Sequence, residues 1–381
     1  MESFGALLRH YGWYAVLAFV LTVFATPVAA RLAWRLGVLD VPDRDLKPHA
    51  RPTPYLGGAA ICLGWTVALL AALPGAGQER HVLLAIMLGG LATTALGLID
   101  DVRNLSPKLR LLGCALIAGA VILHTGIADD LAISILWPFG ITPPPVVGIP
   151  LSFLLGLFIV LGACNSANLI DGLDGLCAGV TAVISLGFFV VAGALAIYVA
   201  LYDWQHAKNA TRLILSLALL GSTLGFLPFN FNPARIFMGD AGSMLLGYNC
   251  GMMILLLNER GVLRWTFGGL MIFALPIFDT ALAIVRRWRA GRPIFAGDRS
   301  HFYDQLVDRG LSVRRVVVIS YGLAAVYAIL GCGTVVLAIR MRYLLVIYAL
   351  SVLATIALII LTGMATPEQQ PKPGVPDRSA A

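Results

Sequence analysis

Charged side chains are scarce in this sequence. Only 12% of its 381 residues are Asp, Glu, Lys or Arg, and 59% are hydrophobic. Soluble globular chains carry about 25% charged and about 45–50% apolar residues, so this composition cannot cover the surface of a soluble enzyme. It also excludes disorder, because disordered chains are rich in charge and poor in aliphatic residues. The mean hydropathy of +0.86 instead favours a membrane protein.

Cysteine pairs are missing as well. None of the six cysteines forms a Cys-x-x-Cys pair, and all lie in or beside apolar runs, so neither a disulfide framework nor a zinc site is indicated. The net charge of +7 would suggest nucleic acid in a soluble protein. In a membrane protein it is typical of basic cytoplasmic loops, and we therefore expect no nucleic-acid partner.

Long apolar runs are abundant. A bilayer core needs roughly 17–25 mostly apolar residues per helix, and the runs predict an all-α polytopic membrane protein with about eleven spans. The fifth run is short and enters a polar stretch, which is typical of a broken helix that faces a cavity. Before it, Thr142–Pro150 reads as an outer loop with four prolines. The runs are Trp13–Leu36, Leu56–Leu73, Val82–Ile99, Leu109–Ile127, Leu151–Ala163, Leu176–Ala200, Leu213–Pro228, Ser243–Leu257, Thr266–Val285, Val316–Ile339 and Tyr343–Thr362.

Lys and Arg are distributed unevenly between alternate loops. With an outer N-terminus, the inner loops hold seventeen of them and the outer side eight, and the C-terminal tail adds two. The positive-inside bias therefore predicts an outer N-terminus and a cytoplasmic C-terminus. Residues 1–365 form one predicted membrane domain, and residues 366–381 a disordered tail rich in Pro and Gln. Thr26–Ala30 resembles a signal cleavage site, but the apolar run continues past it, so we expect an uncleaved first span.

Acidic residues gather on the same inner side. Eleven of the twenty lie in the inner loops or at span ends that face them, and Asp279 lies in the inner half of the ninth span. A face that is both basic and acidic suits the binding of a polyanion through a divalent metal. Four segments there carry the candidate chemistry.

The first segment is a proline-stiffened loop with the cations Lys47, His49 and Arg51. These side chains suit phosphate, although a basic loop of this kind can also contact anionic lipid.

The second segment ends an apolar helix with Asp100 and Asp101. Two carboxylates there are costly unless they bind a cation or pair with a base. Oxygen ligands of this kind suit Mg²⁺. The alternative is a solvated helix end with Asp–Arg pairing.

The third segment places Asn165, Asn168 and Asp171 on one helix face. Gly172 and Gly175 allow tight turns around Asp174. The run lacks the ligand spacing of a calcium-binding EF-hand, and it contains no Lys or Arg to pair with its acids.

The fourth segment runs from Asn230 to Ser243. Asp240 is predicted to begin a helix between Gly239 and Gly242, where backbone N–H groups can approach a phosphate. Phe237 can stack on a base. An ordinary Asp or Ser helix start is the alternative.

Together the four segments resemble the polyprenyl-phosphate N-acetylhexosamine-1-phosphate transferases, glycosyltransferase family 4. That family includes undecaprenyl-phosphate GlcNAc-1-phosphate transferases and the phospho-MurNAc-pentapeptide transferase. The match runs in the family's order from about Asp40 to Leu306. Its motifs are Lys47…His49…Pro52-Thr53-Pro54…Gly57-Gly58, Asp100-Asp101, Asn165-x-x-Asn168-x-x-Asp171-Gly-x-Asp174-Gly and Asn230-x-x-Pro233-Ala234-x-x-Phe237-Met238-Gly239-Asp240-x-Gly242-Ser243.

The resemblance implies a membrane transferase with a cytoplasmic site in the plasma membrane. Its donor would be a UDP-HexNAc, most simply UDP-GlcNAc, and its acceptor undecaprenyl phosphate within the bilayer; a homodimer is also considered. The implied cofactor is Mg²⁺, or Mn²⁺ in its place. Asp240 is the implied main metal ligand, with Asn168 as a second and Asp100 and Asp101 beside the metal. The residues implied to bind the nucleotide and sugar-phosphate are Lys47, His49, Asn165, Asp171, Asp174, Asn230, Phe237 and Gly239.

One segment departs from the family. GlcNAc-type members usually carry Asp-x-x-His-Leu-His-His, whereas this chain reads Asp298-Arg299-Ser300-His301-Phe302-Tyr303-Asp304. Only the first histidine remains, which leaves the donor sugar open. The basic loop still places Arg292, Arg299 and His301 near the donor phosphates.

The implied reaction is phosphoryl transfer, with Asp100, Asp101, Asp240 and Lys47 as its catalytic residues. The acceptor phosphate attacks the β-phosphate of the donor and expels UMP. Its second pKa, about 6, leaves it ionised at neutral pH, so positioning and electrostatics outweigh proton removal by Asp100 or Asp101. A covalent route through an Asp stays open. The rival classes are a transporter and an inactive family member.

Overall fold

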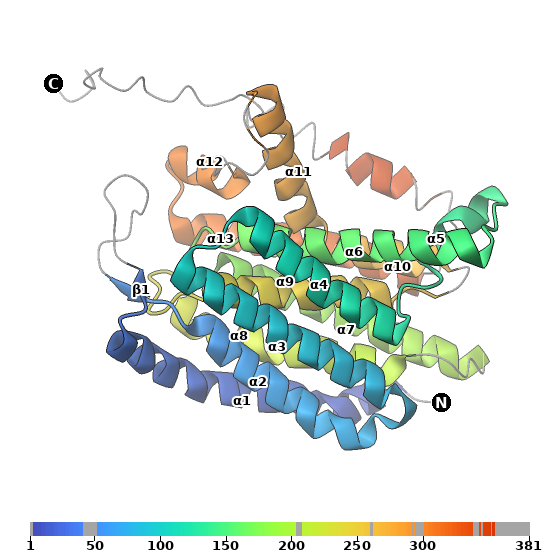
Figure 1. Cartoon of the computed structure of the whole chain (residues 1–381), viewed down its shortest axis with the longest axis horizontal. Coiled ribbons are helices and arrows are strands. Elements are labelled where there is room, and N and C mark those ends of the chain that lie inside the picture. The colour runs from blue at the N-terminus through green and yellow to red at the C-terminus, as the bar shows by residue number, and fades with distance from the viewer. Residues whose placement is uncertain are drawn as a thin grey trace.

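The computed structural model describes residues 3–40, 52–202, 208–259, 262–291, 293, 301–337, 343, 346–351 and 353–354, without the side chains of residues 199–202. In this part of the chain, long helices lie side by side as one bundle (Figure 1). The long helices of the bundle are α1 Phe4–Leu36, α2 Gly57–Ala72, α3 Arg80–Arg103, α4 Pro107–Thr125, α6 Pro145–Leu169, α7 Leu176–Tyr202, α8 Asn209–Asn230, α9 Gly239–Leu256 and α13 Val313–Val336. Helix α11 Ala274–Arg289 is steeply inclined to them (Figure 1). The shorter elements are α5 Leu131–Leu136, α10 Leu263–Ile272, α12 Phe302–Asp308, β1 Leu39–Asp40, β2 Thr53–Pro54 and the 3-10 turns Leu73–Gly75, Gly77–Glu79 and Trp137–Phe139.

Helix α9 forms the centre of the bundle. Every residue from Ala241 to Leu256 is buried, and the helix packs against α3, α6 and α2. Two glycines let its neighbours approach its first turn. A Cβ at Gly97 on α3 would lie 2.6 Å from the Cα of Ala241, and one at Gly58 on α2 would collide with the backbone of Gly242. The start of α9 is therefore held by direct backbone packing.

A short antiparallel pair lies at the same end of the bundle. Leu39 of β1 pairs with Pro54 of β2, and Asp40 pairs with Thr53. The Pro54 carbonyl then accepts the Phe237 N–H at 2.9 Å. These bonds tie the chain that follows α1 to the segment that enters α9.

Eight described helices are long and apolar enough to cross a membrane, and a bent pair, α10 with α11, makes nine. The all-α polytopic architecture is therefore confirmed, whereas the count of eleven is not reached. The predicted run Ser243–Leu257 forms the buried α9, which is not among the eight. Most of the run Tyr343–Thr362 and the whole predicted tail, residues 366–381, lie outside the described residues.

Two predicted spans differ in shape. The fifth is not short: α6 begins at Pro145, inside the expected loop, and continues to Leu169. Pro145 suits the first turn of a helix, where no intrahelical partner is lost. The ninth span is not continuous, because α10 and α11 meet at 72°. Pro276 lies in the first turn of α11 and has no N–H for the carbonyl of Ile272, the last residue of α10. The break between the two helices falls beside this proline.

Candidate active site at one end of the bundle

Four helix termini meet at the end of the bundle that carries β1. They are the C-termini of α3 and α6 and the N-termini of α4 and α9, and side-chain bonds join them directly. Sequence-distant polar residues are thereby gathered in one place. Asp240 lies in the first turn of α9, so the predicted helix start is confirmed.

Asp100 and Asp101 have different partners although they are adjacent. The Asp101 carboxylate accepts the N–H of Asp240 at 2.7 Å and that of Ala241 at 3.2 Å. It thus caps α9 from another helix and lies at the positive end of the helix dipole. Asp240 lies in the first turn but is not the N-cap residue, so it does not cap the helix itself.

Arg110 joins the second carboxylate to the site. Its Nη1 lies 3.2 Å from Oδ2 of Asp100 and 3.2 Å from Oδ2 of Asp240. Asp100 is buried and also accepts the N–H of Leu105 at 2.7 Å. The alternative of Asp–Arg pairing is thus realised for Asp100, through a cation that it shares with Asp240.

Arg110 is one of the seventeen inner-loop cations, and no motif in the sequence distinguishes it from the others. The available signal was its place in the first turn of α4, directly after the Ser106–Pro107 helix start. That start follows the Asp100–Asp101 pair by a few residues and points Arg110 back toward it.

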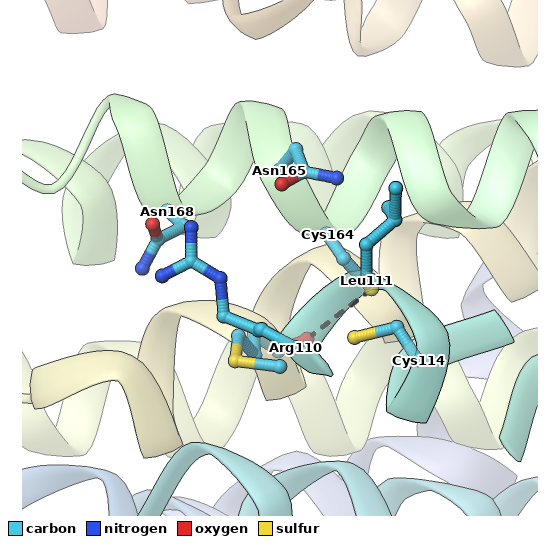
Figure 2. Close-up of a pocket in the computed structure, with 7 residues that line it drawn as sticks. Arg110, Leu111, Cys114, Cys164, Asn165 and Asn168 are labelled. Carbon is cyan, nitrogen blue, oxygen red and sulfur yellow. Dashed lines mark hydrogen bonds between the residues drawn. The ribbon is translucent and has the colours of Figure 1, made fainter. Parts of the chain in front are cut away.

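Asn168 completes this cluster from α6. Its Nδ2 donates to Oδ1 of Asp240 at 2.6 Å and to Oγ of Ser243 at 3.1 Å. Figure 2 shows Arg110 extending toward Asn168 along a small pocket whose wall also includes Asn165. The pocket lies between α4, α6 and α9, and Leu111, Cys114, Cys164 and Met244 line the rest of it.

The chemistry of this cluster fits a divalent cation that takes further ligands from its substrate. Among the described residues no three His, Cys, Asp or Glu side chains are grouped to hold a metal. Mg²⁺, however, commonly uses one or two carboxylates plus substrate phosphates. The guanidinium of Arg110 already brings Asp100 and Asp240 together around one positive charge. For Asn168 to serve as a ligand, its amide would turn its oxygen toward the metal.

The turn between α6 and α7 carries the predicted donor residues. Asn165 and Asn168 share α6, but Asp171 lies beyond the end of that helix, so the three do not form one helical face. Burial raises the pKa of Asp171, and the carboxylates of Asp240, Asp101 and Asp174 raise it further. A cation bound here would relieve that repulsion.

Asp174 and Asn230 connect this turn to the segment before α9. Oδ2 of Asp174 accepts the Asn232 amide and the Ala234 N–H, each at 2.9 Å. Asn230 is buried; it accepts the Gly175 N–H and donates to the Ile236 carbonyl, each at 3.0 Å. Both side chains therefore shape the two loops that flank the site.

Of the other predicted site residues, the structure describes Phe237, Gly239 and His301, and the rest lie outside the described residues. Phe237 is half-buried, and Gly239, which follows Met238, has φ of +67° and leaves no room for a Cβ beside Asp101. His301 is only 4% exposed, and its Nδ1 lies 2.7 Å from Asp279 on α11. Lys47, His49, Arg292 and Arg299 lie outside the described residues.

Comparison with known proteins identifies relatives over most of the chain. The family model for glycosyl transferase family 4 matches residues 83–258. A probable undecaprenyl-phosphate N-acetylglucosaminyl 1-phosphate transferase of Bacillus subtilis is 34% identical over 87% of this chain and 89% of its own length. A decaprenyl-phosphate N-acetylglucosaminephosphotransferase of Mycobacterium leprae is 33% identical over 96% and 92%, respectively.

A third relative extends the comparison to another sugar. The phospho-N-acetylmuramoyl-pentapeptide-transferase of Bacillus subtilis is 32% identical over 83% of this chain and 95% of its own length. These names are those of transferases, which leaves the transporter alternative without support. The matched region includes Asp100, Asp101, Asn168 and Asp240. With apolar helices around a cluster of acidic side chains and relatives of this identity and coverage, the chain is an integral membrane transferase that belongs to glycosyl transferase family 4.

Proposed function

We propose that this protein transfers GlcNAc-1-phosphate from UDP-GlcNAc to undecaprenyl phosphate and releases UMP, the first step of a cell-envelope glycan. The observation that carries the proposal is the position of Asp240, held at the start of α9 by Asp101, Asn168 and Arg110. Two of the three relatives described above are named for N-acetylglucosamine transfer to a polyprenyl phosphate. The reaction takes place at the plasma membrane, with the site on its cytoplasmic face, where the basic loops are expected.

The proposed step is a direct displacement at phosphorus. An acceptor phosphate oxygen forms a bond to the β-phosphorus of the donor. The bond from that phosphorus to the oxygen bridging the α-phosphate breaks, and UMP leaves with its electron pair. The acceptor phosphate is already ionised at neutral pH, so it does not depend on a protein base.

The hydrogen-bond partners of Asp100 and Asp101 indicate what these two residues do in the proposed reaction. The carboxylate of Asp101 accepts two backbone N–H groups, and that of Asp100 is paired with Arg110 and the Leu105 N–H. Both carboxylates therefore already serve as acceptors within the protein, which favours a positioning role for each. We assign Asp101 to holding α9 and Arg110 to attracting a phosphate to the Asp240 cluster.

Asp240, Asn168 and Asp100 are the residues that would hold Mg²⁺, or Mn²⁺ in its place. When bound, the metal would neutralise charge on the donor pyrophosphate. The side chains themselves position the phosphates and hold the reacting end of the bundle together.

The decisive assay measures UMP release by the purified protein with undecaprenyl phosphate, Mg²⁺ and UDP-GlcNAc. We expect release by the wild type and none by Asp240→Ala. Asp130→Ala is the matched control, because Asp130 precedes the outer helix α5 and its side chain makes no capping bond there. No release with any UDP-HexNAc would reject the transferase reaction for this chain. Normal release by Asp240→Ala would reject the role of Asp240.

A further inference from the structure

Tyr303 closes the end of α6. Its hydroxyl donates to the Leu169 carbonyl at 2.7 Å, and only 3% of the residue is exposed. The last carbonyls of a helix have no intrahelical donor, so this bond satisfies one of them. Gly172 lies directly beneath the ring, and any Cβ there would collide with the hydroxyl. The turn that carries Asp171 is therefore built around Tyr303.

An acid–histidine pair holds Tyr303 in place. Asp279 on α11 contacts Nδ1 of His301 at 2.7 Å and accepts the Phe302 N–H at 3.1 Å. The rings of His301 and Tyr303 stack with centroids 5.3 Å apart and planes within 5°. A continuous set of contacts thus runs from α11 through His301 to the end of α6, one residue from Asn168.

A second tyrosine holds the other end of the same turn. The Tyr321 hydroxyl, from α13, donates to the Gly175 carbonyl at 2.5 Å, while Asn230 accepts the Gly175 N–H. Two tyrosine hydroxyls from different helices therefore bracket residues 169–175. Between them lie Asp171, whose pKa is raised by the nearby carboxylate of Asp240 after the larger effect of burial, and Asp174, which accepts the Ala234 N–H in the loop before α9.

We propose that Tyr303, supported by the Asp279–His301 pair, is a positioning residue that fixes the end of α6 and the Asp171 turn for phosphoryl transfer. It stands at a position where the resembling family usually carries a histidine. Because its side chain is buried against Leu169 and Gly172, it acts through the protein rather than on the donor. Asp304, at the next position, accepts the His301 N–H at 3.3 Å and so belongs to the same structural unit. The kinetic part of the proposal rests on the transferase function proposed above.

Tyr303→Phe tests it, because the substitution keeps the ring and removes only the hydroxyl. Tyr248→Phe is a matched control. Tyr248 is 1% exposed, donates to the Ile86 carbonyl at 3.2 Å and also lies over a glycine, Gly89, but in the interface of α9 with α3. Both variants lose one buried tyrosine–carbonyl bond, so similar losses of thermal stability are expected.

Two measurements separate position from stability. Hydrogen exchange of the amides in residues 170–176, followed by mass spectrometry without substrate, should accelerate in Tyr303→Phe and stay unchanged in Tyr248→Phe. UMP release should show a kcat about 10–100-fold lower for Tyr303→Phe, by analogy with the loss on replacing groups that orient metal ligands, with a much smaller change in KM for the donor.

The outcomes are distinct. Exchange and kcat in Tyr303→Phe that match those of Tyr248→Phe would overturn the positioning role. Faster exchange with an unchanged kcat would overturn its link to catalysis. A wild type that releases no UMP would reject the proposed transfer and the kinetic role with it, whereas the exchange comparison would still decide whether Tyr303 holds the turn.

Discussion

The Arg110→Ala variant tests whether Arg110 offsets the repulsion between the carboxylates of Asp100 and Asp240. Arg110→Ala deletes the one described cation that contacts both Asp100 and Asp240, each at 3.2 Å. Hydrogen bonds to charged groups contribute about 1.5–3 kcal/mol each. The arginine side chain is 25% exposed and that of Asp240 31%, so solvent screening places both bonds near the lower end. We expect about 3 kcal/mol of lost unfolding free energy when divalent ions are chelated.

The same substitution should make the protein more dependent on metal. A ligand that binds only the folded state stabilises it by about 2.7 kcal/mol at 100 times its Kd. With Arg110 absent, Mg²⁺ would be the cation that separates Asp100 from Asp240. The thermal midpoint of Arg110→Ala should therefore rise more on addition of Mg²⁺ than that of the wild type.

Thermal unfolding in detergent, with EDTA or with Mg²⁺, measures both effects without substrate. Arg110→Lys is the control, because it keeps the charge and loses the guanidinium geometry, and it should fall between the wild type and the alanine variant. If Arg110→Ala and the wild type have the same thermal midpoint in EDTA, the claim that Arg110 stabilises the acidic cluster is refuted. An equal response to Mg²⁺ would refute the metal at this cluster.

Two further predictions concern the packing of the helix bundle, one close to the site and one far from it. Gly97→Ala should lower UMP release, because its new carbon would lie 2.6 Å from the Cα of Ala241; overpacking of this kind costs about 1–3 kcal/mol. Gly162→Ala, with no atom within 4 Å, should leave release unchanged, and equal effects of the two would contradict the packing argument. Arg212→Ala should lower the unfolding free energy by about 3 kcal/mol, the lower end for a broken buried ion pair, because Arg212 is fully buried whereas its partner Glu259 is 21% exposed. Folded Arg212→Ala should keep its kcat, since Arg212 lies at the opposite end of α8 from Asn230; a lower kcat would refute that separation.

Much of the site was predictable because its acidic residues lie where apolar runs begin or end. Asp100 and Asp101 interrupt an apolar run at its end, and Asp240 lies between glycines at the start of another. Burial of a carboxylate is costly without a partner, so such positions indicate function even in one sequence. The structure confirms that these three residues come together.

The roles within the cluster were not predictable in the same way. Neighbouring helix residues point about 100° apart, so only the packing of α3 on α9 decides that Asp101 caps a helix and Asp100 meets Arg110. From hydropathy, the fifth span was also predicted to end at Ala163, whereas α6 continues to Leu169. The polar residues Asn165 and Asn168 continue α6, because their partners are other protein groups rather than lipid.

The break between α10 and α11 has a similar cause. Pro276 was visible in the sequence, but the apolar run around it continues without a gap. A proline removes one N–H and can bend a helix, but Pro27, Pro150 and Pro228 lie inside the continuous helices α1, α6 and α8, so a proline alone did not predict this break.

The close approach of α2 and α3 to the first turn of α9 has a consequence for how such an enzyme can change over evolution. Backbone contact at Gly58 and Gly97, rather than exchangeable side chains, sets where Asp240 stands. Substitutions elsewhere can change the side chains around Asp240 while the position of Asp240 itself stays the same. Substrate preference can then diverge through side chains outside these contacts, while the path of the backbone keeps Asp240 in place.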